Sequence, residues 1–345
     1  MRRQVVNDPD QMVAEALEGL ALSHPDLVRY DPRRQIVTRR HQATDKVALL
    51  SGGGSGHEPL HAGFVGVGML DVAVPGAIFA SPTALQLHEG TLAADNGQGV
   101  LHIVKNYTGD VLNFTIAREL ADDDGVRTAE VLVDDDLATD SNNDDTEDDE
   151  EDDGGPGRRG TAAVVAVEKL CGAAAEASAS LDELAQLGAD VVKRSSTLAF
   201  ALEAGTHPGQ DRAGFDLEAG EVEFGVGIHG ERGRSRIDFA AADDLVAHVV
   251  DPLVESLGLA RGDAVLAIVN DLGSAYPLET YVAARAMHRQ LDGRGVTVAR
   301  SLVGPYVTSL DMHGLSITLV RVDDDLLRLW DAPVHTPALT WGGAR

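Results

Sequence analysis

The chain has very few cysteines and lysines, and it has no long apolar run. Cys171 is the single cysteine among 345 residues, which excludes an intrachain disulfide and a multi-cysteine zinc site. Residues such as Asp71 and Glu168 interrupt the apolar stretches well before the ~20 residues that a membrane-spanning helix needs. Asn7 and Asp8 stand where a signal peptide would have its apolar segment, so we expect a soluble, cytoplasmic protein.

Basic residues are scarce as well. The chain has 28 Lys and Arg against 56 Asp and Glu, which gives a formal net charge of −28. Nucleic acids and anionic membranes are bound by a basic face that displaces counterions, so we expect neither as a partner. The lysines are Lys46, Lys105, Lys169 and Lys193. An acidic surface poor in lysine is what adaptation to high salt produces, because salt screens the repulsion between carboxylates. We therefore expect a salt-adapted source, with an ordinary acidic protein as the alternative.

Short apolar runs alternate with helical patterns along the chain. The apolar runs predict strands at 47–50, 72–74, 100–104, 130–133, 162–166, 222–230, 264–270, 296–302 and 315–322. Helical spacing predicts helices at 10–22, 82–89, 113–122, 181–200, 245–257 and 280–292. This alternation predicts an α/β protein with two α/β domains, residues 1–193 and 194–345, whose sheets are mixed and mostly parallel.

Residues 134–153 differ in composition from the rest of the first domain. Thirteen of these twenty residues are acidic. Like charges at this density repel one another and leave little apolar surface to bury, which predicts a solvated loop. A calcium site would need a defined spacing of oxygen ligands and a turn glycine, which the run does not show.

A glycine-rich turn, Gly52-Gly-Gly-Ser-Gly56, follows the first predicted strand of this domain. Its bare backbone N–H groups can bind an anion, but the lysine of a nucleotide P-loop is replaced by His57. His57 and His61 flank Glu58 as in zinc proteases. Pro59, however, is tolerated only in the first turn of a helix, which would place the two histidines out of register. We therefore expect no metal site, and a zinc hydrolase is a minor alternative.

Two further turns carry residues that can do chemistry. Lys105 and Asp110 follow the predicted strand at 100–104, and the carboxyl ends of such strands are favoured site positions. There Lys105 can hold an oxygen and Asp110 can accept a proton or cap a helix. His229 lies in a glycine-lined turn that permits a close approach to its imidazole, although a lone histidine is more often structural. Cys171 lies in an apolar, alanine-rich segment and is expected to be a buried hydrophobe.

Taken together, these motifs resemble the dihydroxyacetone-binding K subunit of dihydroxyacetone kinases, and the resemblance covers nearly the whole chain. The segments that carry it are residues 18–21, 52–59, 61–66, 76–82, 105–114, 227–231, 300–304, 306–309 and 329–333. Several motifs in this order and at these spacings are specific for the family.

The resemblance implies two α/β domains per subunit, a homodimer, and dihydroxyacetone as the substrate. His229 would form a covalent hemiaminal with the C2 carbonyl, and neutral imidazole is nucleophilic near neutral pH. Glycerol has no electrophilic carbon and would not be captured. Asp110 would be the general base on the terminal hydroxyl, with His57 as hydrogen-bond partner and second candidate proton acceptor. Lys105 would hold an oxygen of the triose. The backbone that would line the triose is that of Gly54, Ser55 and Gly56.

The resemblance also implies that the nucleotide lies on a separate helical domain. Because no fused domain follows Arg345 in this sequence, we expect a multi-subunit system with no cofactor on this chain. A helical L subunit would carry ADP and Mg²⁺, and a phosphocarrier M subunit of the phosphoenolpyruvate-dependent phosphotransferase system would recharge it. The alternative from a different class is a non-enzymatic dihydroxyacetone sensor that activates a transcription regulator, since a sensor needs the same ligand site.

Overall fold

The computed structural model describes residues 4–139, 157–209 and 213–342. Its α-helices are α1 (Met12–Ser23), α2 (Ala84–Ala94), α3 (Thr108–Asp123), α4 (Ala163–Glu176), α5 (Leu181–Lys193), α6 (Ala242–Ser256), α7 (Pro277–Arg294) and α8 (Asp324–Trp330). Its strands are β1 (Val28–Asp31), β2 (Ile36–Arg39), β3 (Ala48–Ser55), β4 (Val72–Ile78), β5 (Val100–Lys105), β6 (Thr128–Val133), β7 (Ser195–Glu203), β8 (Glu221–Phe224), β9 (Ser235–Asp238), β10 (Ala264–Asp271), β11 (Thr297–Gly304), β12 (His313–Val322), β13 (Val334–His335) and β14 (Thr340–Trp341). Short 3₁₀ helices are η1 (Pro9–Gln11), η2 (Ala62–Phe64) and η3 (Leu137–Thr139).

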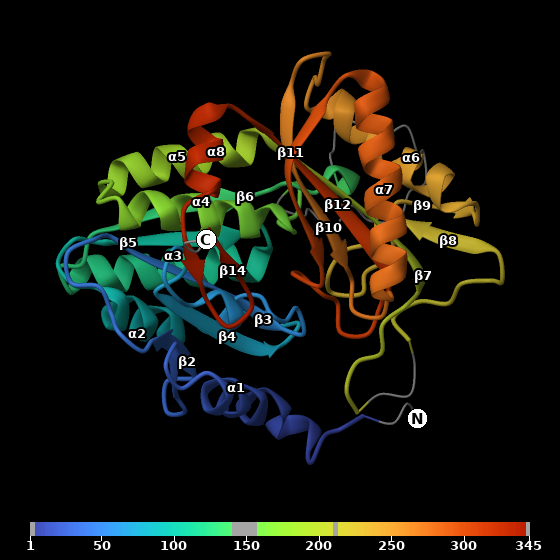
Figure 1. Cartoon of the computed structure of the whole chain (residues 1–345). Coiled ribbons are helices and arrows are strands. Elements are labelled where there is room, and N and C mark those ends of the chain that lie inside the picture. Colours follow the sequence, from blue (N-terminus) through green and yellow to red (C-terminus); the bar gives the residue numbers. More distant parts are fainter. Residues whose placement is uncertain (1–3, 140–156, 210–212, 343–345) are drawn as a thin grey trace.

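The first sheet has the strand order β1-β2-β4-β3-β5-β6. Its inner pairs β4–β3, β3–β5 and β5–β6 are parallel, while β1 and β2 form an antiparallel edge. Helices α2 and α3 cover one face, where Leu87 and Phe114 pack against alternate residues of the strands such as Leu50. Helices α4 and α5 cover the other face, against residues such as Leu101. Figure 1 shows this sheet with its helices beside the second, steeper sheet.

The second sheet has the order β11-β10-β12-β7-β8-β9. The β10–β11 pair is parallel and the other pairs are antiparallel. Helices α6 and α7 pack on one face around Val249 and Met287. The predicted α/β class with mixed sheets is confirmed, and the parallel pairing is concentrated in the first sheet.

Helix α4 was not expected from the sequence pattern, and the strand predicted at 162–166 is wrong. Residues Ala163 to Ala175 are all buried, because α4 lies between the two sheets and contacts β3 and β5 of the first and β7 and β12 of the second. A helix that is apolar all round lacks the polar face that reveals a helical period. The helix predicted at 181–200 is also wrong in its last part, since α5 ends at Lys193 and Ser195 begins the buried strand β7.

The first residues of the acidic run at 134–153 include two that are buried in the protein. Asp135 and Asp136 are buried, so the prediction of a solvated loop is wrong for these two residues. Asp135 accepts hydrogen bonds from the backbone N–H groups of Thr161 (2.6 Å) and Ala163 (3.0 Å) and from the Thr161 hydroxyl (2.8 Å), which ties the entry of α4 to β6. Asp136 pairs with Arg159 at 2.7 Å, and burial raises the pKa of Asp136 to about 6. Residues 140–153 of the run lie outside the described residues.

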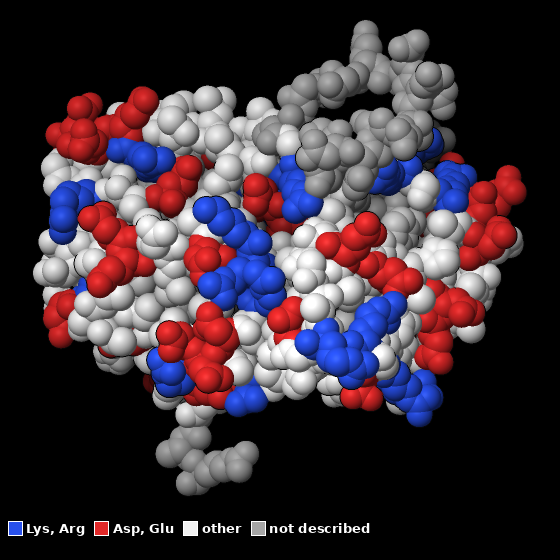
Figure 2. All heavy atoms as spheres, turned by 90° about the horizontal axis from the view of Figure 1, so that it is seen from above, with Lys and Arg blue, Asp and Glu red and all other residues white. Residues whose placement is uncertain are grey.

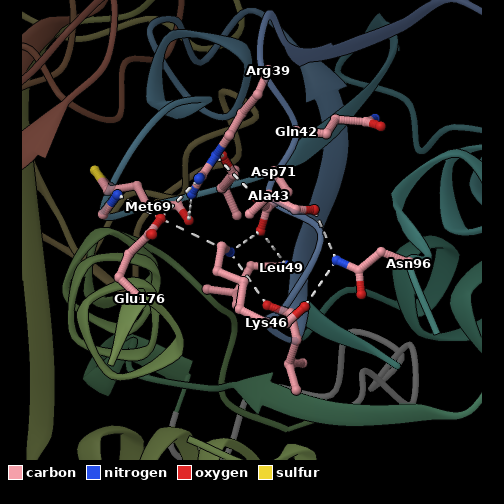
Figure 3. Close-up of polar contacts among 12 residues, drawn as sticks. Arg39, Gln42, Ala43, Lys46, Leu49, Met69, Asp71, Asn96 and Glu176 are labelled. Atoms are coloured by element: carbon pink, nitrogen blue, oxygen red, sulfur yellow. Dashed lines mark hydrogen bonds and ion pairs between the residues drawn. The ribbon is translucent and has the colours of Figure 1, made fainter. Parts of the chain in front are cut away.

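A buried cluster of charges joins the amino end of β3 to α4 (Figure 3). Asp71 contacts Arg39 Nε at 3.0 Å and Lys46 Nζ at 2.6 Å, and Arg39 contacts Glu176 at 2.8 Å. Asp71 also accepts the backbone N–H of Leu49 at 2.8 Å. Removing one member would leave an uncompensated buried charge, so the cluster fixes how α4 sits on the sheet.

Most of the lysine side chains are buried. Lys46, Lys105 and Lys169 are buried, and Lys193 is exposed. Surface arginines are often paired with carboxylates, as Arg194 is with Asp323 at 2.9 Å. Figure 2 shows acidic side chains spread over one face, with smaller groups of basic side chains between them. Within the described residues, no helix is long and apolar enough to cross a membrane.

Candidate active site

The candidate site lies where three neighbouring strands of the first sheet end. Ser55 ends β3, Lys105 ends β5, and Ser81 follows β4. Asp110 lies in the first turn of α3, directly after β5. The segment between β8 and β9 brings His229 to the same place, with its ring against that of His57. The carboxyl ends of parallel strands are where α/β proteins usually build their sites.

Lys105 and Asp110 form a buried ion pair in this site. Lys105 Nζ lies 3.1 Å from Asp110 Oδ2, and the two side chains are 1% and 6% exposed. The Ser81 hydroxyl donates a short hydrogen bond to the other carboxylate oxygen of Asp110. The Lys105 ammonium also lies 3.5 Å from the Gly52 carbonyl oxygen and 3.4 Å from His61 Nε2. Each of its N–H groups therefore has an acceptor within the protein.

His57 has one engaged and one unengaged ring nitrogen. Its Nδ1 lies 2.8 Å from the carbonyl oxygen of Thr308, so Nδ1 carries the proton and donates it. Its Nε2 is buried and has no hydrogen-bond partner in the described part of the chain. Burial, together with the charge of His229 when that ring is protonated and the charge of Lys105, lowers the pKa of His57 well below 6.5. The ring is therefore neutral near pH 7, and the Nε2 lone pair can accept a proton.

His229 is oriented by Glu231. The Glu231 carboxylate accepts the backbone N–H of His229 at 2.9 Å and lies 3.2 Å from His229 Nδ1. Burial acts to raise the pKa of Glu231, but the hydrogen bond and charge of His229, with the charge of Arg159, hold that pKa at about 2. Because the carboxylate accepts the proton on Nδ1, the ring presents the lone pair of Nε2. A Cβ at Gly227 would lie 2.2 Å from Glu231 Oε2, so glycine is needed for this arrangement.

Aromatic rings surround the two imidazoles. Tyr107 and Phe79 lie edge to face with His229, with ring centroids 4.4 Å and 5.5 Å away. Phe79 also stacks on His57 at 5.2 Å. The Tyr107 hydroxyl is buried without a partner among the residues described, and burial raises its pKa well above 10. The rings limit water around His229, and the phenol remains a hydrogen-bond donor.

The glycine run packs closely against neighbouring groups of the site. A Cβ at Gly53 would lie 2.3 Å from Lys105 Nζ, and one at Gly54 would lie 2.7 Å from the backbone N of Ala80. The Ser55 hydroxyl donates to the Gly76 carbonyl oxygen at 2.7 Å, and the Gly56 N–H donates to Glu58 at 3.0 Å. Gly54, Ser55 and Gly56 therefore shape the wall beside Phe79, and the Ser55 hydroxyl and the Gly56 N–H are bonded within the protein.

The two histidines of the apparent zinc motif have separate partners. His61 Nδ1 lies 2.6 Å from Glu168 Oε1, whereas His57 contacts Thr308, and residues 57–61 form a turn. Among the residues that the structure describes, no group of three His, Cys, Asp or Glu could hold a metal. Cys171 is buried, and burial raises its thiol pKa to about 12, which confirms its prediction as a buried hydrophobe.

Four site residues were missed at the sequence level. They are Phe79, Ser81, Tyr107 and Glu231. All four lie within the motif segments at 76–82, 105–114 and 227–231. The segments that identified the family were therefore also the signal that could have found them.

The two α/β units meet at a site that holds a histidine, a lysine and a carboxylate. Residues 18–338 match the Dak1 domain, and the chain belongs to the Dak1 family. It is 42% identical to the dihydroxyacetone-binding subunit DhaK of the PEP-dependent dihydroxyacetone kinase of Escherichia coli, over 99% of each chain. It is 44% identical to the corresponding subunit of the PTS-dependent dihydroxyacetone kinase 1 of Listeria innocua, over 97% of this chain and 99% of the relative.

Solved structures agree with this assignment. The dihydroxyacetone kinase of C. freundii superposes with a TM-score of 0.86 at 32% identity, and the match covers 99% of this chain and 61% of that one. A dihydroxyacetone kinase operon co-activator superposes with a TM-score of 0.87 at 31% identity, covering 94% of this chain and 97% of that one.

Proposed function

We propose that this chain is the dihydroxyacetone-binding subunit of a phosphoenolpyruvate-dependent dihydroxyacetone kinase in the cytoplasm. It captures dihydroxyacetone covalently on His229 and presents the terminal hydroxyl for phosphorylation. The observation that carries the proposal is the pair of oriented imidazoles, His229 held by Glu231 and His57 held by Thr308, with ring centroids 4.7 Å apart.

Capture uses the Nε2 lone pair of His229. Nε2 adds to the C2 carbonyl carbon, the C=O π bond breaks, and O2 takes up a proton to become the hemiaminal hydroxyl. The ring is then cationic, and it becomes neutral when Nδ1 releases its proton to solvent. The Glu231 carboxylate, 3.2 Å from Nδ1, stabilises the positive charge in between.

Transfer uses the groups on the first sheet. Asp110 takes the proton of the terminal hydroxyl as its oxygen attacks phosphorus, and His57 Nε2 is the second candidate proton acceptor. Both oxygens of Asp110 are already bonded, to Lys105 and to Ser81, but each carboxylate oxygen can accept one further hydrogen bond. Lys105 can exchange its longest contact, 3.5 Å to the Gly52 carbonyl oxygen, for an oxygen of the triose.

The phosphoryl donor is expected on a partner. His57 stands where a nucleotide P-loop would have its lysine after the glycine run, which supports a donor site outside this chain. We propose that a helical L subunit carries ADP with Mg²⁺, that a phosphocarrier M subunit recharges it, and that this chain is a homodimer. The names of the bacterial relatives, PEP- or PTS-dependent, support this assignment.

Capture is tested with dihydroxyacetone labelled with ¹³C at C2. On binding, the carbonyl resonance should move to the sp³ region, and intact-protein mass should increase by one dihydroxyacetone. His229→Ala should lose both signals while keeping its circular dichroism spectrum. His248→Ala, on the distant helix α6, is the matched control and should behave as the parent. A bound sp³ signal in His229→Ala would overturn the covalent role.

The second candidate is a dihydroxyacetone sensor that activates a transcription regulator, favoured by the structural match to an operon co-activator. Both candidates require capture of dihydroxyacetone, so a capture assay does not distinguish a kinase subunit from a sensor. A phosphotransfer assay with an L subunit and the phosphorylated carrier distinguishes them. Formation of dihydroxyacetone phosphate supports the kinase subunit, and capture without any transfer supports the sensor.

A further inference from the structure

His61 and Glu168 are buried polar residues that the proposed reaction does not use. His61 is 6% exposed and Glu168 is fully buried in the middle of α4. The pair joins His61 Nδ1 to Glu168 Oε1 at 2.6 Å. The other ring nitrogen of His61 lies 3.4 Å from Lys105 Nζ. The two residues therefore continue the polar chain that begins at Ser81 and Asp110.

The partners of His61 determine which of its nitrogens carries a proton. Lys105, paired with the Asp110 carboxylate at 3.1 Å, is a donor without acceptor capacity. Nε2 of His61 faces this ammonium and must therefore be the acceptor. Burial, with the charge of Lys105, lowers the pKa of His61 well below 6.5, so the ring is neutral. The single ring proton then lies on Nδ1 and is donated to Glu168 Oε1. Burial raises the pKa of Glu168 well above 4.5, and Oε1 can accept this proton whether or not the carboxyl group is ionised.

The lysine side chain needs such an acceptor. Its long stem has several rotatable bonds, and ordering a free lysine is entropically costly. The ammonium is held by Asp110 from α3, Gly52 from β3 and His61 from the turn before η2. These acceptors come from separate elements, so together they define one position for Nζ beside Gly53.

We propose that His61 and Glu168 are positioning residues: Glu168 holds His61 in the Nδ1–H tautomer, and His61 Nε2 holds the Lys105 ammonium against Asp110. The proposal rests on the proposed function, in which Lys105 contacts the triose. A purely structural role, in which the pair only ties the turn to α4, would depend on Nδ1 and Glu168 and not on Nε2.

Two amide substitutions separate these roles. Gln at position 61 can place its carbonyl oxygen near the Nε2 position and accept from Lys105. Asn reaches only the Nδ1 position, where its amide can donate to Glu168. His61→Gln should keep transfer within about threefold of the parent, whereas His61→Asn should lower kcat roughly tenfold or more, the scale of a lost charged hydrogen bond. Capture on His229 should stay within a few-fold in both variants.

Glu168 is tested in the same way. Glu168→Gln can still accept the Nδ1 proton through its carbonyl oxygen and should transfer at nearly the parent rate. Glu168→Leu removes the acceptor and should lower kcat by about as much as His61→Asn. Equal rates for His61→Gln and His61→Asn, or a faster His61→Asn, would overturn the proposal.

A measurement on the parent protein keeps the proposal testable if the variants fail to fold or if no transfer is observed. In protein labelled with ¹⁵N-histidine, long-range ¹H–¹⁵N spectra distinguish the two neutral tautomers from the imidazolium. The signal of His61 is identified by its loss in His61→Gln, or by its contact with Glu168 if that variant is unfolded. The Nδ1–H form is expected, and the Nε2–H form or the imidazolium would overturn the proposal. Because this readout needs no substrate, its failure is distinct from failure of the proposed function.

Discussion

The rings of His57 and His229 lie edge to face with centroids 4.7 Å apart and an interplanar angle of 77°. One residue follows β3 of the first sheet, and the other lies between β8 and β9 of the second. Each ring donates its Nδ1 proton to a fixed oxygen, that of Thr308 or that of Glu231. Both Nε2 lone pairs are thereby available in one site, that of His229 to the proposed nucleophile and that of His57 to a proposed base.

Asp110→Asn should separate capture from transfer. The variant keeps the shape of the side chain but lacks the proton-accepting charge, so transfer should fall by roughly two orders of magnitude or more. Capture should persist, because His229 is unchanged. The assays are the ¹³C signal and the coupled formation of dihydroxyacetone phosphate. Asp123→Asn, exposed at the end of the same helix, is the control, and parent-like transfer by Asp110→Asn would remove Asp110 from the base role.

Gly53→Ala should impair transfer without removing any polar group. The new Cβ would lie 2.3 Å from Lys105 Nζ, so the flexible end of the lysine must move away from Asp110. We expect a loss of kcat of roughly tenfold or more with little change in stability, because a displaced charged hydrogen bond is worth about that much. Gly293→Ala in α7 has open space around it and should leave kcat unchanged. An active Gly53→Ala would show that the position of Lys105 is unimportant.

Asp135→Asn should destabilise the fold. The carboxylate of Asp135 is buried and accepts hydrogen bonds from the backbone N–H groups of Thr161 and Ala163. In the variant, the NH₂ group of the asparagine would replace one of these acceptor oxygens and would face a backbone N–H donor. We expect a loss of about 2–4 kcal/mol in the free energy of unfolding, measured with urea. Asp123→Asn should change it by less than ~0.5 kcal/mol, as usual for exposed sites. Equal stability of the two variants would mean that Asp135 is solvated after all.

Lys169 should make stability depend on pH in the alkaline range. Burial lowers the pKa of Lys169 to about 8, against an ordinary 10.5, while Asp331 acts in the opposite direction. Between these values the unfolded chain binds more protons than the folded one, so this group makes stability rise with pH. The free energy of unfolding of the parent should therefore rise between pH 8 and pH 10 by roughly 1–3 kcal/mol relative to that of Lys169→Met, since one pKa unit is about 1.4 kcal/mol. A difference between parent and variant that is constant over this range would contradict the assignment.

Added salt should stabilise the protein if the net charge of −28 reflects salt adaptation. Screening of the repulsion between carboxylates should raise the thermal midpoint most steeply as the Debye length falls from about 30 Å at 0.01 M to about 10 Å at 0.1 M. The rise should then flatten. A midpoint that increases linearly up to molar salt would instead indicate a general effect of the salt on apolar hydration.

Local patterns in the sequence predicted β3, β4, β5 and β6 of the first sheet, because these strands are short apolar runs, and six helices, because each has an apolar face. They did not predict β1 and β2, since residues 28–39 are mixed in polarity. They failed at α4 and β7, which are buried on several sides and lack a polar period. The sequence patterns also failed at Asp135 and Asp136. Composition does not distinguish one acidic residue of a run from another, whereas in the structure these two are buried.

For the site, residue types and motif order were sufficient to name His57, Lys105, Asp110 and His229. The pairing of His229 with Glu231 and the placement of Phe79 and Tyr107 around it depend on how distant segments meet. No pattern within one segment contains that information. The partner of His61 was likewise hidden, because Glu168 lies on the helix that was expected to be a strand.

The burial of three of the four lysines makes Lys193 at the end of α5 the one exposed lysine. Amine-reactive esters should therefore label the lysines of the folded protein at Lys193, and should reach Lys105 only when the protein unfolds. A fluorophore or an immobilisation linker can consequently be attached at one lysine without mutagenesis. The rates at which Lys46 and Lys169 become reactive in denaturant would report exposure of the amino end of β3 and of α4.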